Sequence, residues 1–484
     1  MNVLFVSPEV NPLVRTGGLG DVVGSLPLAL KKLGVDVRVV CPLHRSCKGI
    51  DAKVLRNQFK VKIGSQSILG SIHETRLGPS DVPAYLIDLP QFFDRDGIYA
   101  DQGGDYRDNP QRAFALCQAA LEVEFVTGWR PHIIHAHDWM AAPVCAYVNA
   151  MKSPRGKEPK IRSVLTIHNL QHQGVFSYKD FVTSGLPDSH WGADGFEKDG
   201  ALNLLKGGIQ HADKITTVSP TYASEIRTME YGCGLEKSLQ YRGADLVGIL
   251  NGIDLDSWDP QKDNSLPQPF SLNRPKAGKE ACKLALLNEL KMDPSLNSPL
   301  FGVVSRLCGQ KGLDLLTEIL PQLMAETHAS FAIVGSGEAH EEQAIRELSA
   351  SFPHRIGSFI GFDDGLARRI FAGSDFFIMP SRFEPCGLAQ QYAMRYGSLP
   401  IARKTGGLAD TIVPISKGEK SPTGFLFDHA SGKELWSSIK QALEVFANNR
   451  KFSQMRKNAL LKTCGWDHAA EQYLQTYQWA LEMD

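Results

Sequence analysis

The feature that most constrains this chain is a short glycine-containing loop sequence that occurs once near each end. The sequence RTGGL at 15–19 and the sequence KTGGL at 404–408 each follow an apolar, strand-like run and precede a helical pattern. Such a loop brings backbone amides close to a phosphate, although a steric turn is the alternative for either loop alone. The pair predicts two nucleotide-type α/β halves. We expect a deep cleft between them to be the active site.

Both halves alternate short apolar runs with longer helical patterns, which is typical of βαβ units and mainly parallel sheets. Between about 48 and 90 the pattern is more hairpin-like. The predicted strands are 3–7, 35–40, 133–135, 164–167, 215–218 and 247–250 in the first half, then 300–305, 331–334, 356–360, 376–379, 399–402 and 424–427.

The length of 484 residues is enough for large cores and favours two domains. Asn251 and Gly252 precede a polar, proline-containing run that indicates a domain crossing, so the predicted domains are 1–252 and 253–464. The segment 466–481 places Ala469, Ala470, Tyr473, Tyr477 and Leu481 on one helical face, which needs a partner surface.

The composition argues against several classes of partner. The 52 basic and 53 acidic residues nearly cancel, so we expect neither nucleic-acid nor membrane-surface binding. Nine cysteines without a C-x-x-C pair argue against a zinc site or a disulfide framework. A strand-like run directly after Met1 leaves no room for a targeting peptide, and no apolar run approaches a membrane span. We therefore expect a cytoplasmic protein.

The segment after the predicted strand 376–379 supplies both a charge and hydrogen-bond donors. Glu384 lies just beyond the carboxyl end of this strand, where open α/β sheets bind ligands. Pro385 is suited to the first position of a helix. The amides of Cys386, Gly387 and Leu388 would then be available to oxygen atoms of a sugar or a phosphate.

Two cations follow the predicted strand 300–305. Arg306 and Lys311 flank a glycine, and a guanidinium with an ammonium can stabilise a departing nucleoside diphosphate without a metal. Two surface cations on an ordinary loop are the alternative. The nearby run GSGEA at 335–339 fails the dinucleotide fingerprint because His340 takes the place of the third glycine. We interpret it as a turn beside a base or ribose.

Polar side chains also end two strands of the first half. His135 and His137 alternate to one side of a strand, which leaves a metal site open, although a third ligand cannot be placed. We instead expect His137, Asp138 and Trp139 to line the crevice as hydrogen-bond partners and a sugar-stacking ring. His168, at the next strand end, is either a satisfied core histidine or a site residue. Glu9, Asp21 and Asn251 also lie at element ends facing the presumed crevice.

The whole set of motifs, in this order, resembles the bacterial glycogen synthases and plant starch synthases. The set consists of both TGGL loops with HAHDW, TIHN, VSPTYA, NGID, SRLCGQKGLDLL and SRFEPCGL, and the resemblance covers essentially the whole chain. It implies a retaining glucosyltransferase with the two-Rossmann-domain fold called GT-B. Such enzymes transfer glucose from ADP-glucose to the non-reducing 4-hydroxyl of an α-1,4-glucan, and no cofactor or metal is expected.

The resemblance also implies roles for individual residues. Arg306 and Lys311 would hold the diphosphate, Glu384 the glucose hydroxyls, and His168 and Asp138 would lie at the reacting sugar. Residues 465–484 would return to the N-terminal domain. The remaining substrate-binding residues implied are Glu9, Arg15, Gly17, Gly18, Asp21, Tyr99, His137, Trp139, Asn169, Asn251, Phe362, Cys386, Gly387, Leu388, Thr405, Gly406 and Gly407.

Two positions depart from the family pattern, and two rival functions stay open. Arg15 stands where the family usually has lysine, and Phe362 where many bacterial relatives have tyrosine. The first rival is a nucleotide-sugar epimerase of the same fold. The second is a non-catalytic glucan-binding relative, against which the complete set of Glu384, Arg306, Lys311 and His168 argues.

Overall fold

The computed structural model describes residues 1–55, 57–78, 81–151, 161–416, 419–462 and 465–483. Cys464 and Asp484, the last residue of the predicted returning segment 465–484, lie outside these ranges. The chain divides into two compact units, Met1–Gly252 with Trp466–Asp484 and Ile253–Gly465. The first unit is therefore built from two separate stretches of the chain.

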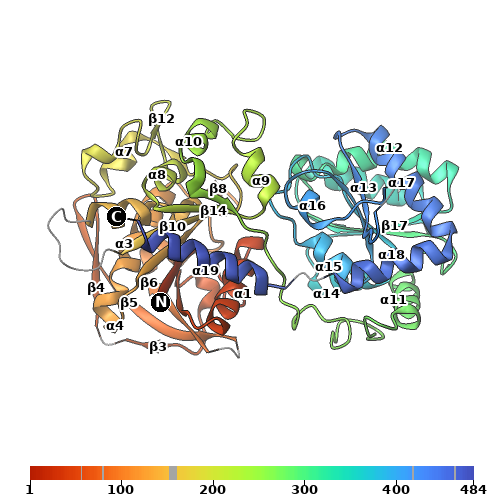
Figure 1. The fold of residues 1–484 in the computed structure, drawn as a ribbon, viewed down its shortest axis with the longest axis horizontal. Helices are drawn as coiled ribbons and strands as arrows, with labels where there is room; N and C mark the ends of the chain where they lie inside the picture. The colour runs from red at the N-terminus through yellow and green to blue at the C-terminus, as the bar shows by residue number, and fades with distance from the viewer. Residues whose placement is uncertain (56, 79–80, 152–160, 417–418, 463–464, 484) are drawn as a thin grey trace. The chain divides into compact units, whose positions relative to one another are not determined.

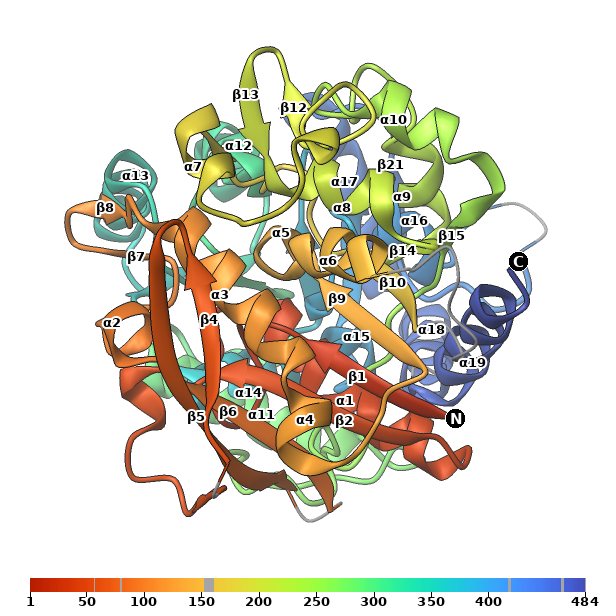
Figure 2. The same cartoon turned by 90° about the vertical axis from the view of Figure 1, so that its left-hand side faces the viewer.

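The first unit contains a large, mainly parallel sheet. Its strands are arranged in the order β15-β14-β10-β9-β1-β2-β6-β5-β3, and β4 pairs with β5. The pairs from β15 to β6 are parallel, while β5 pairs antiparallel with β6, β3 and β4. In Figure 2, where this unit faces the viewer, β9, β1 and β2 run side by side. The strands are β1 Asn2–Val6, β2 Asp36–Pro42, β3 Lys53–Val54, β4 Phe59–Ile63, β5 Gln66–Leu77, β6 Val82–Asp88, β9 Ile133–His137, β10 Arg162–Ile167, β14 Lys214–Thr217 and β15 Leu246–Gly248.

Helices cover this sheet, and one of them comes from the far end of the sequence. The helices are α1 Gly18–Lys32, α2 Pro90–Phe93, α3 Asn109–Leu121, α4 Val123–Thr127, α5 Asp138–Ala141, α6 Pro143–Met151, α7 Tyr178–Val182, α8 Leu204–His211, α9 Pro220–Glu225, α10 Glu236–Tyr241 and α19 Asp467–Leu481. The short strand pairs β7 Ala100–Asp101 with β8 Gly104–Asp105, and β11 Val175–Phe176 and β12 Glu197–Lys198 with β13 Ala201–Asn203, complete the unit.

Helix α19 completes the core of the first unit. Figure 1 shows this helix, in dark blue, packed beside α1. Ala469, Ala470, Tyr473 and Tyr477 are buried in the cluster that contains Val3 and Phe5 of β1, as the helical pattern predicted. Leu481, which the same pattern placed on this face, is 39% exposed because the helix ends there.

The second unit is a six-stranded parallel sheet in the order β18-β17-β16-β19-β20-β21. The strands are β16 Leu300–Val304, β17 Ser330–Gly335, β18 Ile356–Ile360, β19 Phe376–Met379, β20 Leu399–Arg403 and β21 Phe425–Phe427. The helices are α11 Lys276–Glu289, α12 Leu313–Glu326, α13 Ala339–Ser351, α14 Asp364–Gly373, α15 Ala389–Arg395, α16 Gly406–Thr411, α17 Gly432–Ala447 and α18 Asn449–Leu461. The strands predicted from apolar runs in both halves are confirmed.

In each sheet the chain reverses the direction in which it adds strands. The reversal falls between β1 and β9 in the first unit and between β16 and β19 in the second. Crossover helices leave a crevice at the carboxyl end of such a switch point, and open α/β sheets bind ligands there. The loops after these four strands are therefore where each unit is expected to meet a ligand.

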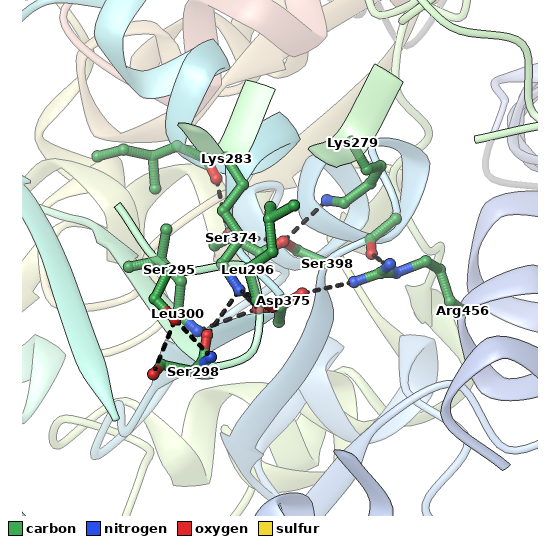
Figure 3. Close-up of polar contacts among 12 residues, drawn as sticks. Lys279, Lys283, Ser295, Leu296, Ser298, Leu300, Ser374, Asp375, Ser398 and Arg456 are labelled. Carbon is green, nitrogen blue, oxygen red and sulfur yellow. Dashed lines mark hydrogen bonds and ion pairs between the residues drawn. The ribbon is translucent and has the colours of Figure 1, made fainter. Parts of the chain in front are cut away.

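A buried polar network fixes α11 and α18 to the sheet of the second unit (Figure 3). Asp375 accepts hydrogen bonds from Lys283 at 2.7 Å and Arg456 at 2.8 Å, and from the amide of Leu300 at 3.0 Å. Lys279 donates to the carbonyls of Ser374 at 2.8 Å and Tyr396 at 3.0 Å. Burial raises the pKa of Asp375, but Lys283 and Arg456 outweigh it, and the pKa lies below its ordinary value. The network places the start of β19, and hence its carboxyl end, relative to β16.

Candidate active site

At the switch point of the first unit, Glu9 holds the glycine-containing loop that follows β1. Its carboxylate accepts hydrogen bonds from the Thr16 amide at 2.6 Å, the Thr16 hydroxyl at 2.8 Å and the Gly17 amide at 3.3 Å. The hydroxyl of Tyr99 donates to the same carboxylate at 2.7 Å. Glu9 is 3% exposed. A carboxylate of the protein thus occupies the amide of Thr16 and that of Gly17, a predicted substrate-binding residue, and it joins Tyr99 to the loop.

Two histidines meet at the ends of β9 and β10. The imidazole Nδ1 of His137 lies 3.0 Å from Nε2 of His168, so one nitrogen donates to the other. Burial lowers the pKa of His168 to about 3, and burial together with the neighbouring His135 and His168 lowers that of His137. Both rings are therefore neutral at neutral pH. They can donate or accept single hydrogen bonds and contribute no positive charge.

Asp138, at the start of α5, orients its carboxylate toward the end of β10. It accepts hydrogen bonds from the amides of His168 at 2.7 Å and Asn169 at 3.4 Å. Its backbone has φ +58°, in the left-handed region that aspartate tolerates better than most residues. Burial raises the pKa of Asp138 to about 7, although the two amides oppose this shift. The carboxyl group therefore changes charge within the neutral pH range.

Other predicted residues of the first unit surround these groups. The rings of Tyr99 and Trp139 have centroids 5.9 Å apart, and Arg15 forms an ion pair with Asp21 at 2.8 Å. Asn251 is buried just after β15. The structure thus brings together, in connected groups, Glu9 with Gly17 and Tyr99, Tyr99 with Trp139, Arg15 with Asp21, and His137 with Asp138, His168 and Asn169.

At the switch point of the second unit, a cation and a carboxylate meet between β16 and β19. Lys311 donates to Glu384 at 2.6 Å, and the hydroxyl of Ser381 donates to the same oxygen at 3.0 Å. Glu384 is 5% exposed. Arg306 is exposed and donates to the side chain of Gln310 at 3.1 Å. Lys311 and Glu384 are therefore in direct contact, and Gln310 links Arg306 to the carbonyl of Phe383, the residue before Glu384.

The glycines after β20 are required by a close backbone approach. A Cβ on Gly406 would lie 2.0 Å from the carbonyl oxygen of Glu384, and one on Gly407 would lie 2.0 Å from that of Cys386. The amide of Gly407 donates to the Glu384 carbonyl at 3.1 Å. Thr405–Gly407 and the loop that bears Glu384 are thus in direct contact. The two glycines are needed here because any side chain would collide with that loop.

The start of the helix after Glu384 differs from the prediction. Pro385 was expected at the first helical position, but α15 begins at Ala389, and Gly387 has φ +68°. Gln390 explains the difference, because its side-chain amide donates to the carbonyls of Cys386 at 3.0 Å and Gly387 at 2.8 Å. These contacts hold the segment as a loop. Its amides are presented from a turn and not from a first helical turn.

Phe362 lies apart from this cluster. It follows β18 and is 78% exposed, and within the described ranges no hydrogen bond or ring contact joins it to another predicted site residue. The GSGEA turn after β17 packs against the loop after β16, because a Cβ on Gly337 would lie 2.0 Å from the carbonyl oxygen of Leu307. These glycines have a steric role.

Several residues without a predicted role hold the candidate site residues in place. Ser381 and Gln390 hold Glu384 and its loop, Gln310 bonds Arg306 and the carbonyl of Phe383, and Thr16 binds Glu9. Ser381 lies in the SRFEPCGL motif and Gln310 in the SRLCGQKGLDLL motif. Their position close to a predicted charged residue was the only indication in the sequence that they contact the site.

Across the described ranges, no group of three metal-ligating side chains is found. No described helix is both long and apolar enough to cross a bilayer.

The two α/β units with parallel sheets have the GT-B fold, and the family profiles that match both units define the class as glycosyltransferase. Sucrose-phosphate synthase of Thermosynechococcus elongatus has the same fold, with a TM-score of 0.62 at 16% identity over 99% of this chain and 98% of that one. The profile of the starch synthase catalytic domain matches residues 2–241, and that of glycosyl transferases group 1 matches residues 298–444.

Relatives that match this chain over its full length identify the family within this class. Glycogen synthase 2 of Geobacter sulfurreducens is 40% identical over 100% of this chain and 99% of its own, and glycogen synthase of Roseobacter denitrificans is 42% identical over 99% of both. The catalytic domain of starch synthase IV from Arabidopsis thaliana, solved with ADP and acarbose, is 31% identical and superposes with a TM-score of 0.91 over 99% of both chains. The chain belongs to the glycogen and starch synthase family.

Proposed function

We propose that this enzyme extends α-1,4-glucans by transferring glucose from ADP-glucose to the non-reducing 4-hydroxyl, with the anomeric configuration retained. The observation that carries the proposal is the contact of Lys311 with Glu384 at 2.6 Å. In a sugar nucleotide the phosphate is bonded directly to the anomeric carbon. A cation for the leaving phosphate and a carboxylate for the sugar hydroxyls must therefore be neighbours, as these two are.

The second unit supplies the donor site in this proposal. Arg306 and Lys311 bind the diphosphate and stabilise its charge as it leaves. Glu384 accepts hydrogen bonds from glucose hydroxyls, and the exposed ring of Phe362 stacks on adenine. The bound ADP of the Arabidopsis relative supports an adenine nucleotide. Further donor contacts come from Cys386, Gly387, Leu388, Thr405, Gly406 and Gly407.

The first unit supplies the acceptor side and the second glycine-containing loop. Because Glu9 already occupies the amides of Thr16 and Gly17, the free part of this loop for a phosphate is the start of α1 at Gly18. Arg15 adds charge there and keeps Asp21 in place. The residues that contact sugars are Glu9, Asp21, Tyr99, His137, Trp139, Asn169 and Asn251.

Transfer follows from these positions without a protein nucleophile. As the bond to the diphosphate breaks, the leaving phosphate accepts the proton of the attacking 4-hydroxyl on the same face of the sugar. His168 lies against the sugar as positive charge develops, and its neutral ring places no opposing charge there. Asp138 orients donor and acceptor. No step in this scheme uses a metal or a cofactor.

A chain-extension assay tests the proposal. The protein is incubated with maltooligosaccharide and either ADP-glucose or UDP-glucose, and product lengths and anomeric linkage are followed by mass spectrometry and NMR. We expect extension by α-1,4-linked glucose with ADP-glucose preferred. Glu384→Gln and Lys311→Met should each lower kcat by at least about 100-fold, the loss typical of a lost electrostatic contact in the transition state. Glu347→Gln, an exposed carboxylate on α13, is the matched control.

The rival functions give different outcomes in the same assay. An epimerase would convert UDP-sugar without any glucan. A non-catalytic glucan-binding protein would bind maltooligosaccharide, but no extension would be detectable above the Glu384→Gln background. Either outcome would refute the proposal.

We also propose that the enzyme works in the cytoplasm. Cys41, Cys117 and Cys282 are buried free thiols, which suits a reducing compartment. Fractionation of the native cells, followed by the extension assay on each fraction, tests this.

A further inference from the structure

A row of four buried side chains connects the last helix of the chain to the central strands of the first unit. The hydroxyl of Tyr477 on α19 lies 2.8 Å from Nδ1 of His135 on β9. The Nε2 of His135 lies 2.6 Å from the hydroxyl of Thr166 on β10, which lies 2.6 Å from the hydroxyl of Thr216 on β14. All four residues are completely buried. The row therefore crosses three neighbouring parallel strands.

The direction of the hydrogen bonds follows from the partners available. Burial lowers the pKa of His135, so its ring is neutral and has one N–H donor and one acceptor nitrogen. Within the described ranges His135 is the only hydrogen-bond partner of the Tyr477 hydroxyl. The buried O–H of Tyr477 must then donate to Nδ1, since a buried donor without an acceptor is costly. It follows that Nε2–H donates to Thr166, whose hydroxyl shares a hydrogen bond with that of Thr216 in which either group can be the donor.

This row lies directly beneath the two histidines of the candidate site. His135 stands two residues before His137 on β9, on the same face, with ring centroids 4.2 Å apart. Thr166 lies on β10, two residues before His168, which directly follows the last residue of that strand. The inner pair of His135 and Thr166 is thus one layer below the outer pair of His137 and His168.

We propose that Tyr477 is a positioning residue for the reaction, which acts through His135 and Thr166 on the His137–His168 pair. Its hydroxyl fixes the tautomer and ring plane of His135, and the ring of His135 packs against His137. The Thr166 contact holds β9 and β10 in one register beneath His168. The last helix therefore has a role in the chemistry of the strand ends and not only in the core.

Tyr473 provides an internal comparison. It lies one helical turn before Tyr477, is also completely buried, and packs its ring against His135 with centroids 5.6 Å apart. The two ring nitrogens of His135 bond Tyr477 and Thr166, and the contact of Tyr473 with this ring is through its own ring. Removing one hydroxyl at each position therefore compares the loss of the bond to His135 with the loss of a neighbouring buried hydroxyl.

The inference rests on the proposed function for its kinetic test and is independent of it for its spectroscopic test. In the extension assay, Tyr477→Phe should lower kcat about tenfold, because small misplacements of reacting groups are costly, while KM for ADP-glucose stays within about twofold. Tyr473→Phe should keep kcat within about twofold. Thr166→Val should lower kcat as Tyr477→Phe does. Thr166→Ser, which keeps the hydroxyl, should have nearly wild-type kcat.

The spectroscopic test uses ring ¹⁵N–¹H NMR spectra of the full-length protein with labelled histidine. In the wild type His135 should appear as the neutral Nε2–H tautomer with a hydrogen-bonded proton. Tyr477→Phe should shift the His135 and His137 nitrogens, and Tyr473→Phe should leave them in place. Equal kcat in the two phenylalanine variants, or histidine spectra that do not respond to Tyr477→Phe, would overturn the proposal. Absence of extension by the wild type, with the expected spectra, would refute only the proposed function.

Discussion

At the scale of single residues, three buried carboxylates near the strand ends differ in the partners that surround them. Glu9 accepts hydrogen bonds from Thr16, Gly17 and Tyr99, whereas Glu384 accepts from an ammonium and a hydroxyl. Asp138 has two backbone amides as its hydrogen-bond donors in the described part of the chain. Burial of Asp138 is opposed by these two amides alone, and it raises the pKa of this carboxyl group to about 7.

The raised pKa of Asp138 predicts a pH-dependent stability difference. A group whose pKa rises to about 7 on folding stabilises the protein fully below its ordinary value of 3.8, and that stabilisation is lost as the pH rises through about 7. Asp138→Asn removes the titration and suits the left-handed backbone, which asparagine tolerates. The unfolding free energy of the wild type minus that of the variant should fall between pH 5.5 and 8.5, measured by urea denaturation. A difference that does not change with pH would contradict this.

The sequence predicts that Glu384, Lys311 and Asp138 lie beyond the carboxyl ends of apolar strands, and the structure places all three there. The carboxyl ends of parallel strands lie at one edge of a sheet, which is why this position could be predicted. Their partners were harder to predict. Glu9 binds Tyr99, which lies 90 positions later, and no local pattern specifies that contact. Gln390 determines the loop after Glu384 through side-chain bonds to carbonyls, which helix-start rules do not include.

At the scale of elements, the approach of two loops in the second unit is set by backbone atoms. Gly406→Ala and Gly407→Ala each place a Cβ 2.0 Å from a carbonyl oxygen, so the loop bearing Glu384 must move. We expect each substitution to lower kcat at least about 100-fold, as a displacement near 1 Å can.

Gly192→Ala is the control for this pair, because a Cβ there meets no atom within 4 Å. It should have nearly wild-type kcat and thermal stability. Wild-type kcat in Gly407→Ala would contradict the assignment of this contact to the site. Circular dichroism on each variant separates loop displacement from unfolding.

The network around Asp375 gives a second prediction at this scale. Asp375→Asn leaves the buried Lys283 and the half-buried Arg456 without their carboxylate, and breaking a buried pair costs about 3–5 kcal/mol of unfolding free energy. Because folding lowers the pKa of Asp375, its contribution is present above the ordinary value of 3.8 and is lost as the pH falls through the folded value.

Urea denaturation at neutral pH and at progressively acidic pH measures this contribution. The penalty of Asp375→Asn should be full at neutral pH and should shrink on acidification. The control is Glu289→Gln, which breaks an ion pair with Arg369 on the surface and should cost about 1 kcal/mol or less. Equal penalties for the two variants would contradict a structural role for the network.

At the scale of the whole molecule, two segments far apart in sequence build the first unit. The division into 1–252 and 253–464 was predicted from the NGID crossing, and the chain separates into compact units at Gly252 and Ile253. The partner of the last helix was not evident from its own residues. An amphipathic pattern predicts that one face of a helix is buried, but it does not identify the surface that covers that face. Only the family resemblance predicted that this helix packs on the N-terminal half.

Fragments of the chain test this division. Residues 253–465 should fold alone, since their core clusters draw only on that stretch. Residues 1–252 alone lack the buried rings of Tyr473 and Tyr477, each worth about 1.5–3 kcal/mol, and should bind hydrophobic dyes. Joining 1–252 to 466–484 through a short glycine–serine linker should restore cooperative unfolding in calorimetry. A cooperatively folded 1–252 fragment would show that α19 is dispensable.

The positions of the first and last residues of the second unit bear on whether this unit can be exchanged between related enzymes. Its first residues and its last lie together, because a Cβ at Gly465 would be 3.0 Å from Leu255 Cδ1. The second unit can therefore be exchanged between relatives as one insert, because its two junctions with the first unit are close together. The two parts of the first unit could still associate after such an exchange, and the ligand specificity of the second unit would be transferred with it.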